Sequence, residues 1–180
     1  MRRLVPAAEG IGASILFASD SWNSLGPNLS GANLTWSGTG AWPAANRALY
    51  VPFTVPETYN AQKMFVYNGT HSGNADIGIY DESWNRLVST GSTASSGDGA
   101  LQEFDITDTL LYRGRYYFGL AFDNGTVTIR RVTTGAAALC SAWGMAQQAT
   151  AFALPSTAIP AIISSDYIPL VGIAGRTLVT

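Results

Sequence analysis

The stretch 114-GRYYFGLAFDNGTVTIR-130 decides the fold class of this chain. Large apolar side chains alternate with other residues over 116–122, which places one set on each face of a β-strand. Asp123-Asn124-Gly125 follows, and Asn-Gly favours the positive φ angles of a type I′ hairpin turn. The alternation resumes over 126–130. The stretch therefore predicts two strands joined by a hairpin.

The same pattern recurs at short intervals before this stretch. Turn residues such as Asn68-Gly69 and the polar loop 91–99 separate one apolar run from the next. Short strands at this spacing predict an all-β fold, an antiparallel β-sandwich or jelly roll. The expected strands span residues 48–55, 62–67, 75–80, 86–90 and 102–106.

The chain divides into three regions by composition. Residues 1–45 are rich in Gly, Ser, Asn and Trp, which predicts an N-terminal arm or short edge strands. Residues 46–150 hold the sandwich, with a further strand expected near 137–148. In 151–180, prolines favour extended chain, so we expect this segment to pack on the sandwich or on a neighbouring subunit.

Charge is scarce, and it is missing altogether from one segment. Charged residues make up 12% of the chain, against roughly 25% in ordinary soluble domains. No Asp, Glu, Lys or Arg occurs from Val132 to Ser165. Glycines and prolines interrupt this segment, so no run approaches the ~20 apolar residues of a membrane-spanning helix. We therefore expect other copies or other proteins to bury part of it.

The remaining composition argues against several functions. A net charge of −2 and a single lysine, Lys63, are unlike the basic stripe of a nucleic-acid-binding protein. The one cysteine, Cys140, makes a Cys-based zinc site improbable and is expected as a buried apolar residue. The one histidine, His71, lies in a loop of turn residues, and no Gly-x-Ser-x-Gly motif accompanies it. We expect no enzymatic activity.

Acidic residues offer two further kinds of site, and both have simpler explanations. Paired carboxylates could hydrolyse glycosides, but Asp76, Glu103 and Asp105 fall on expected solvent faces of strands. Loop oxygens make calcium a better metal candidate than zinc, although turn chemistry explains the same residues. No cofactor is expected. The possible calcium ligands are Asp81-Glu82, Asp98 and Asp123-Asn124.

Several motifs resemble the strands of jelly-roll domains in bacteriophage virion proteins, and comparable patterns occur in carbohydrate-binding-module-like sandwiches. Two later segments, 151–155 and 167–170, also resemble the C-terminal parts of such phage proteins. The resemblance covers roughly residues 46–173 and concerns strands and turns, so it specifies a fold better than an activity. The strand motifs are Val66-Tyr67-Asn68-Gly69, Asp76-Ile77-Gly78-Ile79-Tyr80-Asp81, Asn85-Arg86-Leu87-Val88 and Gly114-Arg115-Tyr116-Tyr117-Phe118.

The resemblance implies a role in a virion or in binding a host surface, and it transfers no catalytic residue. The function we expect is that of a structural protein of the particle, most simply a capsid decoration (cement) protein. It would assemble in the host cytoplasm and contact other virion proteins and copies of itself as a homo-oligomer. The candidate interface residues are Phe152, Leu154, Tyr167 and Leu170.

The alternative function is a carbohydrate-binding module that attaches a tail or fibre to host-surface glycans. Exposed aromatic rings stack on sugars, and Trp84, Trp36 and Trp42 lie in loops or in the arm. The same residues could instead anchor the arm or pack at an interface, where Trp is enriched. In a glycan-binding protein, replacing Trp84 with alanine would abolish binding.

Overall fold

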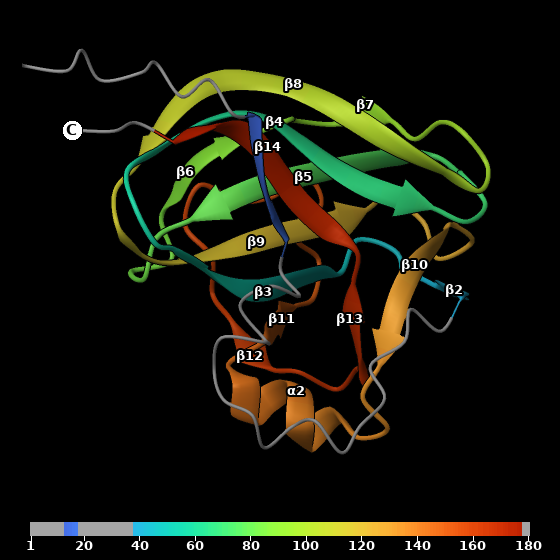
Figure 1. The fold of residues 1–180 in the computed structure, drawn as a ribbon. Coiled ribbons are helices and arrows are strands. Elements are labelled where there is room, and N and C mark those ends of the chain that lie inside the picture. Colours follow the sequence, from blue (N-terminus) through green and yellow to red (C-terminus); the bar gives the residue numbers. More distant parts are fainter. Residues whose placement is uncertain (1–12, 18–37, 178–180) are drawn as a thin grey trace, which may run out of the picture.

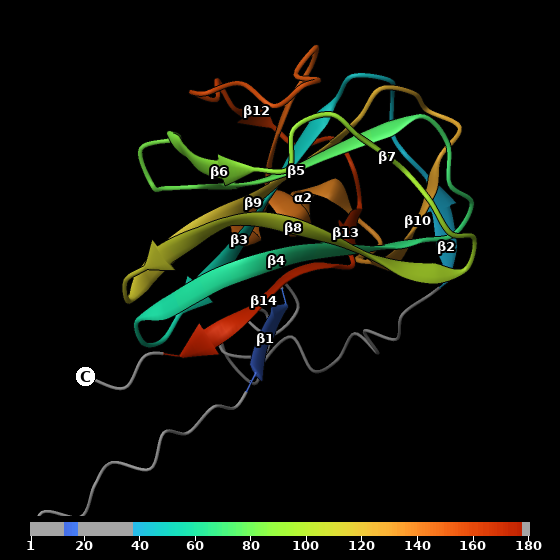
Figure 2. The same ribbon diagram turned by 90° about the horizontal axis from the view of Figure 1, so that it is seen from above.

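The computed structural model describes residues 13–17 and 38–177, in which two antiparallel sheets of seven strands face one another (Figures 1 and 2). The expected all-β sandwich is confirmed. One sheet contains β1 (Ala13–Phe17), β14 (Val171–Thr177), β4 (Tyr59–Asn68), β8 (Ala100–Leu111), β10 (Thr128–Thr133), β2 (Thr39–Ala41) and β13 (Tyr167–Pro169). The other contains β12 (Ala161–Ile162), β11 (Ala146–Gln148), β3 (Ala48–Val55), β9 (Gly114–Phe122), β5 (Asn74–Tyr80), β6 (Arg86–Ser89) and β7 (Thr93–Ala94).

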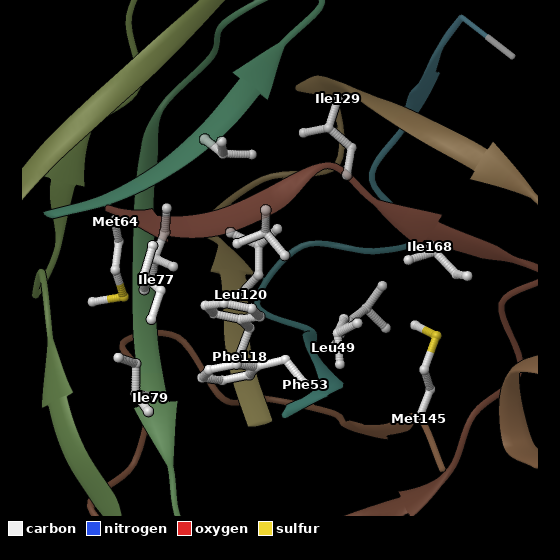
Figure 3. Packing of buried hydrophobic residues seen from close by; sticks show 14 of the residues in the cluster. Leu49, Phe53, Met64, Ile77, Ile79, Phe118, Leu120, Ile129, Met145 and Ile168 are labelled. Carbon is white, nitrogen blue, oxygen red and sulfur yellow. The ribbon is translucent and has the colours of Figure 1, made fainter. Parts of the chain in front are cut away.

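The strand pairing is nested. β3 pairs along its whole length with β9 in the second sheet, and β4 pairs with β8 in the first. Along the chain, β3, β4 and β5 alternate between the sheets, as do β8, β9 and β10. The later strands β8 and β9 return beside β4 and β3, which is the winding of a jelly roll. The alternation that predicted these strands also predicts their buried faces. Phe118, for example, is fully buried between the sheets and stacks on Phe53 with ring centroids 3.9 Å apart (Figure 3).

The expected hairpin at Asp123-Asn124-Gly125 is wrong. β9 pairs with β3 and β5, whereas β10 pairs with β2, β4 and β13, so this turn carries the chain from one sheet to the other. The Asn124 side chain explains the turn, because its Oδ1 accepts the backbone N–H groups of Thr126 and Val127 at 3.0 and 3.1 Å. This local capping replaces the positive φ angles that a type I′ turn needs.

The strand expected near residues 137–148 is wrong over its first half. Residues Ala137–Trp143 form a short helix, α2, and only Ala146–Gln148 form a strand, β11. Ala136-Ala137-Ala138-Leu139 is a run of good helix formers. Gly144 ends the helix at a φ of 99°, a left-handed conformation that glycine adopts without strain. None of the helices in residues 13–17 and 38–177 could span a membrane.

The C-terminal segment forms part of the sandwich. β14 lies between β1 and β4 in the first sheet, with β1 pairing to it from Ala13 to Phe17. β13 extends the other end of the same sheet by pairing with β10. Residues 151–177 thus supply an inner strand, β14, to the first sheet, and the chain between β11 and β12 crosses the outer face of the second sheet.

Candidate functional site

The outer face of the second sheet carries a second, smaller hydrophobic core. The chain between β11 and β12, residues 149–160, crosses this face, and we call it the strap. Together with the sheet it buries a cluster that is separate from the main core between the sheets. The strap lies within the charge-free segment, so the chain itself buries part of that segment. The buried members of the cluster are Ala48, Tyr50, Tyr80, Tyr117, Ala121, Ala151, Leu154 and Ala158.

Small residues on the outer face let the strap approach the sheet closely. A Cβ atom added to Gly78 would come within 3.1 Å of the Leu154 side chain. A Cβ atom added to Gly119 would come within 2.7 Å of the Tyr80 ring. Side chains at these two positions would occupy the space that the strap and its underlying aromatic rings now fill.

Two buried tyrosines bond through their hydroxyl groups to the strap and to the end of β11. Tyr50 and Tyr80 pack edge to face with centroids 5.2 Å apart. The Tyr80 hydroxyl donates to the Pro155 carbonyl at 2.6 Å, and the Tyr50 hydroxyl donates to Gln148 Oε1 at 3.1 Å. Burial raises the pKa of Tyr50 to about 12 and also raises the pKa of Tyr80. Both hydroxyls therefore stay protonated as donors at neutral pH.

The Asp76 carboxylate and the Arg86 guanidinium bond to the backbone N–H and carbonyl groups of one strap residue, Leu154. Asp76 Oδ2 accepts the backbone N–H of Leu154 at 2.9 Å, and Arg86 Nη1 donates to the Leu154 carbonyl. Thr90 also donates to Asp76, at 3.3 Å. Asp76 was expected on a solvent face but is fully buried, because the strap covers that face. Burial raises the pKa of this carboxyl, against the lowering effects of the Leu154 N–H, Arg86 and Thr90.

Replacing Asp76 with asparagine is expected to remove a pH dependence from the free energy of unfolding. The folded-state pKa of Asp76 lies above its ordinary value. Its stabilising contribution is therefore complete below about pH 4 and falls as the pH rises through the folded-state pKa. The asparagine retains an oxygen that can accept the Leu154 N–H, but it does not titrate.

Denaturant unfolding of both proteins from about pH 4 to about pH 7 measures this effect. The stability of the wild type minus that of the variant should decrease as the pH rises. An increase with pH would contradict the burial of the carboxylate. An Asp76→Ala variant is the control, because it removes the acceptor as well and should be less stable than the asparagine variant throughout.

The three candidate tryptophans have different surroundings. Trp84 is half-buried at the edge of the second core, where it stacks on Tyr117 with centroids 4.2 Å apart and meets Tyr50 edge to face. Trp42 is 2% exposed and packs on Phe122 in the main core. Trp36 lies outside the described residues. Packing therefore accounts for the positions of both described candidates.

The candidate interface residues also divide by burial. Leu154 lies in the second core and Tyr167 in the main core, each 3% exposed, so this chain already covers them. Phe152 packs against the second core and is half-buried, as is Leu170 beside β14. The most exposed apolar surface of the charge-free segment therefore comes from other residues.

Two isoleucines supply that surface. Ile159 is 77% exposed and Ile162 is 81% exposed, the highest values among the large hydrophobic side chains of the described part of the chain. We call these residues the exposed isoleucine pair. Glutamine side chains hold the chain around them: Gln148 Oε1 accepts the Ile159 N–H at 2.8 Å, and Gln147 Oε1 accepts the Ser164 N–H at 3.2 Å. The nearest charged residue in sequence is Asp166, and in space Arg47 Nη1 lies 3.5 Å from Ser164 Oγ.

In the polar loops, the residues considered as catalytic groups or calcium ligands make hydrogen bonds within turns. Asp98 Oδ1 accepts the backbone N–H of His71 at 2.8 Å and lies 2.7 Å from His71 Nδ1. These two hydrogen bonds, the backbone one first, lower the pKa of Asp98. Asp81 Oδ1 accepts the backbone N–H groups of Ser83 and Asn85 within its own turn. Within the described ranges, no three His, Cys, Asp or Glu side chains form a cluster that could hold a metal ion.

No protein-family model matches the chain, and no curated protein matches it.

Proposed function

We propose that the protein is a non-enzymatic structural protein of a bacteriophage particle, and that it acts by adhering to neighbouring subunits. A capsid decoration protein is the role that we favour. Its strand and turn motifs resemble virion jelly-roll domains, and its rigid sandwich suits a role as a building block. The exposed isoleucine pair carries the proposal, because an adhesive protein needs apolar surface that its own fold leaves uncovered.

Burial of the exposed isoleucine pair can stabilise a particle when the same contact is repeated between many subunits. Fully burying one isoleucine side chain contributes about 1.5–3 kcal/mol. Ordering and association costs remove much of that for a single contact. In a particle, however, many copies are held together, and each additional contact is made at high effective concentration. A small apolar surface on each copy can therefore stabilise a shell.

The proposal predicts that the chain is a fixed component of the particles encoded by the same genome. Quantitative mass spectrometry of gradient-purified particles should find it at a constant molar ratio to the major capsid protein. Particles made without the gene should recover it when purified chain is added back. Its absence from purified particles, or a ratio that varies between preparations, would overturn the proposal.

A further inference from the structure

The chain contains two Asn-Gly pairs, and they differ in whether the glycine nitrogen is hydrogen-bonded. In such a pair the glycine nitrogen can attack the asparagine side-chain carbon, because the two groups are held in one chain and glycine has no Cβ atom to obstruct the ring that forms. At Asn68-Gly69 this nitrogen donates to the Thr128 carbonyl at 2.7 Å. At Asn124-Gly125 it donates to no acceptor of the described residues. The nucleophile is therefore available at the second pair.

The two asparagine side chains also differ in their access to water. The Asn68 side chain is fully buried, and its Nδ2 donates to the Ser96 carbonyl and to Gln102 Oε1 at 2.7 and 2.8 Å. Asn124 and Gly125 are half-buried in the turn between β9 and β10, so solvent reaches them. Closing the ring releases ammonia and opening it consumes water, so both steps need this access.

The hydrogen bonds of Asn124 lie on the atoms whose charge changes during the attack. Its Oδ1 accepts the backbone N–H groups of Thr126 and Val127 at 3.0 and 3.1 Å. Backbone donors stabilise the negative charge that develops on a carbonyl oxygen under attack. Its Nδ2 lies 2.7 Å from Asp123 Oδ1, a distance at which a carboxyl group can transfer a proton to a leaving nitrogen. The turn therefore favours the reaction at the same atoms that it holds in place.

We infer that Asn124-Gly125 is a self-modification site, at which each chain converts one amide into an acid. The Gly125 nitrogen bonds to Asn124 Cγ and loses its proton, the Cγ–Nδ2 bond breaks, and ammonia leaves with that proton, which Asp123 passes between the two nitrogens. Water then opens the succinimide ring at either carbonyl and leaves aspartate or isoaspartate at position 124. The inference does not depend on the proposed function.

The product is expected to weaken the turn that joins the two sheets. A carboxylate at position 124 carries a negative charge beside the Asp123 carboxylate, and like charges at this distance repel. It also has no amide hydrogen to donate to Asp123. In isoaspartate the Cγ carbonyl becomes part of the backbone, so the side-chain cap on Thr126 and Val127 is lost. The modification is therefore a permanent change in both charge and local structure.

Peptide mapping by mass spectrometry tests the site in the folded, full-length chain after incubation at mildly alkaline pH. Asn124 should gain the mass difference between an amide and an acid at least about tenfold faster than Asn68, and an isoaspartyl methyltransferase should label the product. In guanidinium chloride the two pairs should react at similar rates, because unfolding removes the protection of Asn68. Equal rates at the two pairs in the folded chain, or no isoaspartate at position 124, would overturn the inference.

Two variants test the assigned roles. Gly125→Ala hinders the attack, and its added Cβ atom meets nothing closer than the Ala45 nitrogen at 3.6 Å, so the fold should accept it. Asp123→Asn retains an oxygen that can accept Asn74 Nδ2, but it cannot transfer a proton. Each variant should slow the change at position 124 at least about tenfold and leave the rate at Asn68 unaltered. An unchanged rate at position 124 in either variant would overturn the mechanism.

Discussion

Replacing Tyr80 with alanine is expected to lower the free energy of unfolding by about 3–5 kcal/mol, as for other large aromatic side chains removed from a core. Tyr80 is fully buried, and its ring packs against Tyr50 beneath the strap. The substitution leaves a cavity under the strap and also removes the hydrogen bond to the Pro155 carbonyl. Equilibrium unfolding in urea measures the loss.

A Tyr80→Phe variant separates the two contributions. It keeps the ring and removes only the hydroxyl, so the expected loss is about 1–2 kcal/mol. In both variants, hydrogen exchange at the Leu154 and Ala158 amides should accelerate, because these groups bond the strap to Asp76 and Trp84. A loss below about 1 kcal/mol for Tyr80→Ala would contradict the second core, since buried aromatic residues cost more to remove.

The strands of the sandwich could be predicted because each buries a face toward the main core. Residues 48–55 and 116–122 alternate or run apolar in the way that such burial requires, and they form all of β3 and most of β9. The sheet to which each strand belongs could not be read in this way. The Asn124 turn connects two sheets because of local side-chain hydrogen bonds, while the same Asn-Gly pair is also compatible with a hairpin.

The second core lay beyond sequence prediction because it depends on a contact distant in the chain. Asp76, Gly78 and Tyr80 alternate with buried residues and look like a solvent face, but residues more than 70 positions later cover them. The one signal was the small size of Gly78 and Gly119, which is typical of close approach by another segment.

The sequence indicates that the charge-free segment is buried or contacts another molecule, but it does not show which of its residues are buried and which are exposed. Leu154 and Ile159 are both aliphatic and lie five positions apart. The strap turns Leu154 into the second core and leaves Ile159 77% exposed. Only the path of the backbone, fixed by hydrogen bonds to Asp76, Trp84 and Gln148, distinguishes them.

Replacing both members of the exposed isoleucine pair with serine is expected to weaken self-association at least about tenfold. A tenfold change in affinity corresponds to about 1.4 kcal/mol, which is less than the burial of one isoleucine side chain contributes. Both side chains are mostly exposed, so the stability of the fold should change little. The matched control is Leu87→Ser with Leu101→Ser, which removes aliphatic side chains of 44% and 49% exposure from β6 and β8. The control should associate as the wild type does.

Sedimentation equilibrium of the intact chain over a range of concentrations tests the central claim, that the exposed isoleucine pair joins copies of this protein. The wild type and the control should show a mass that rises above the 19.0 kDa of one chain as the concentration increases. The Ile159→Ser, Ile162→Ser double variant should remain near the mass of one chain at the same concentrations. A wild type that stays monomeric at every concentration, or a double variant that associates as strongly as the wild type, would contradict the account.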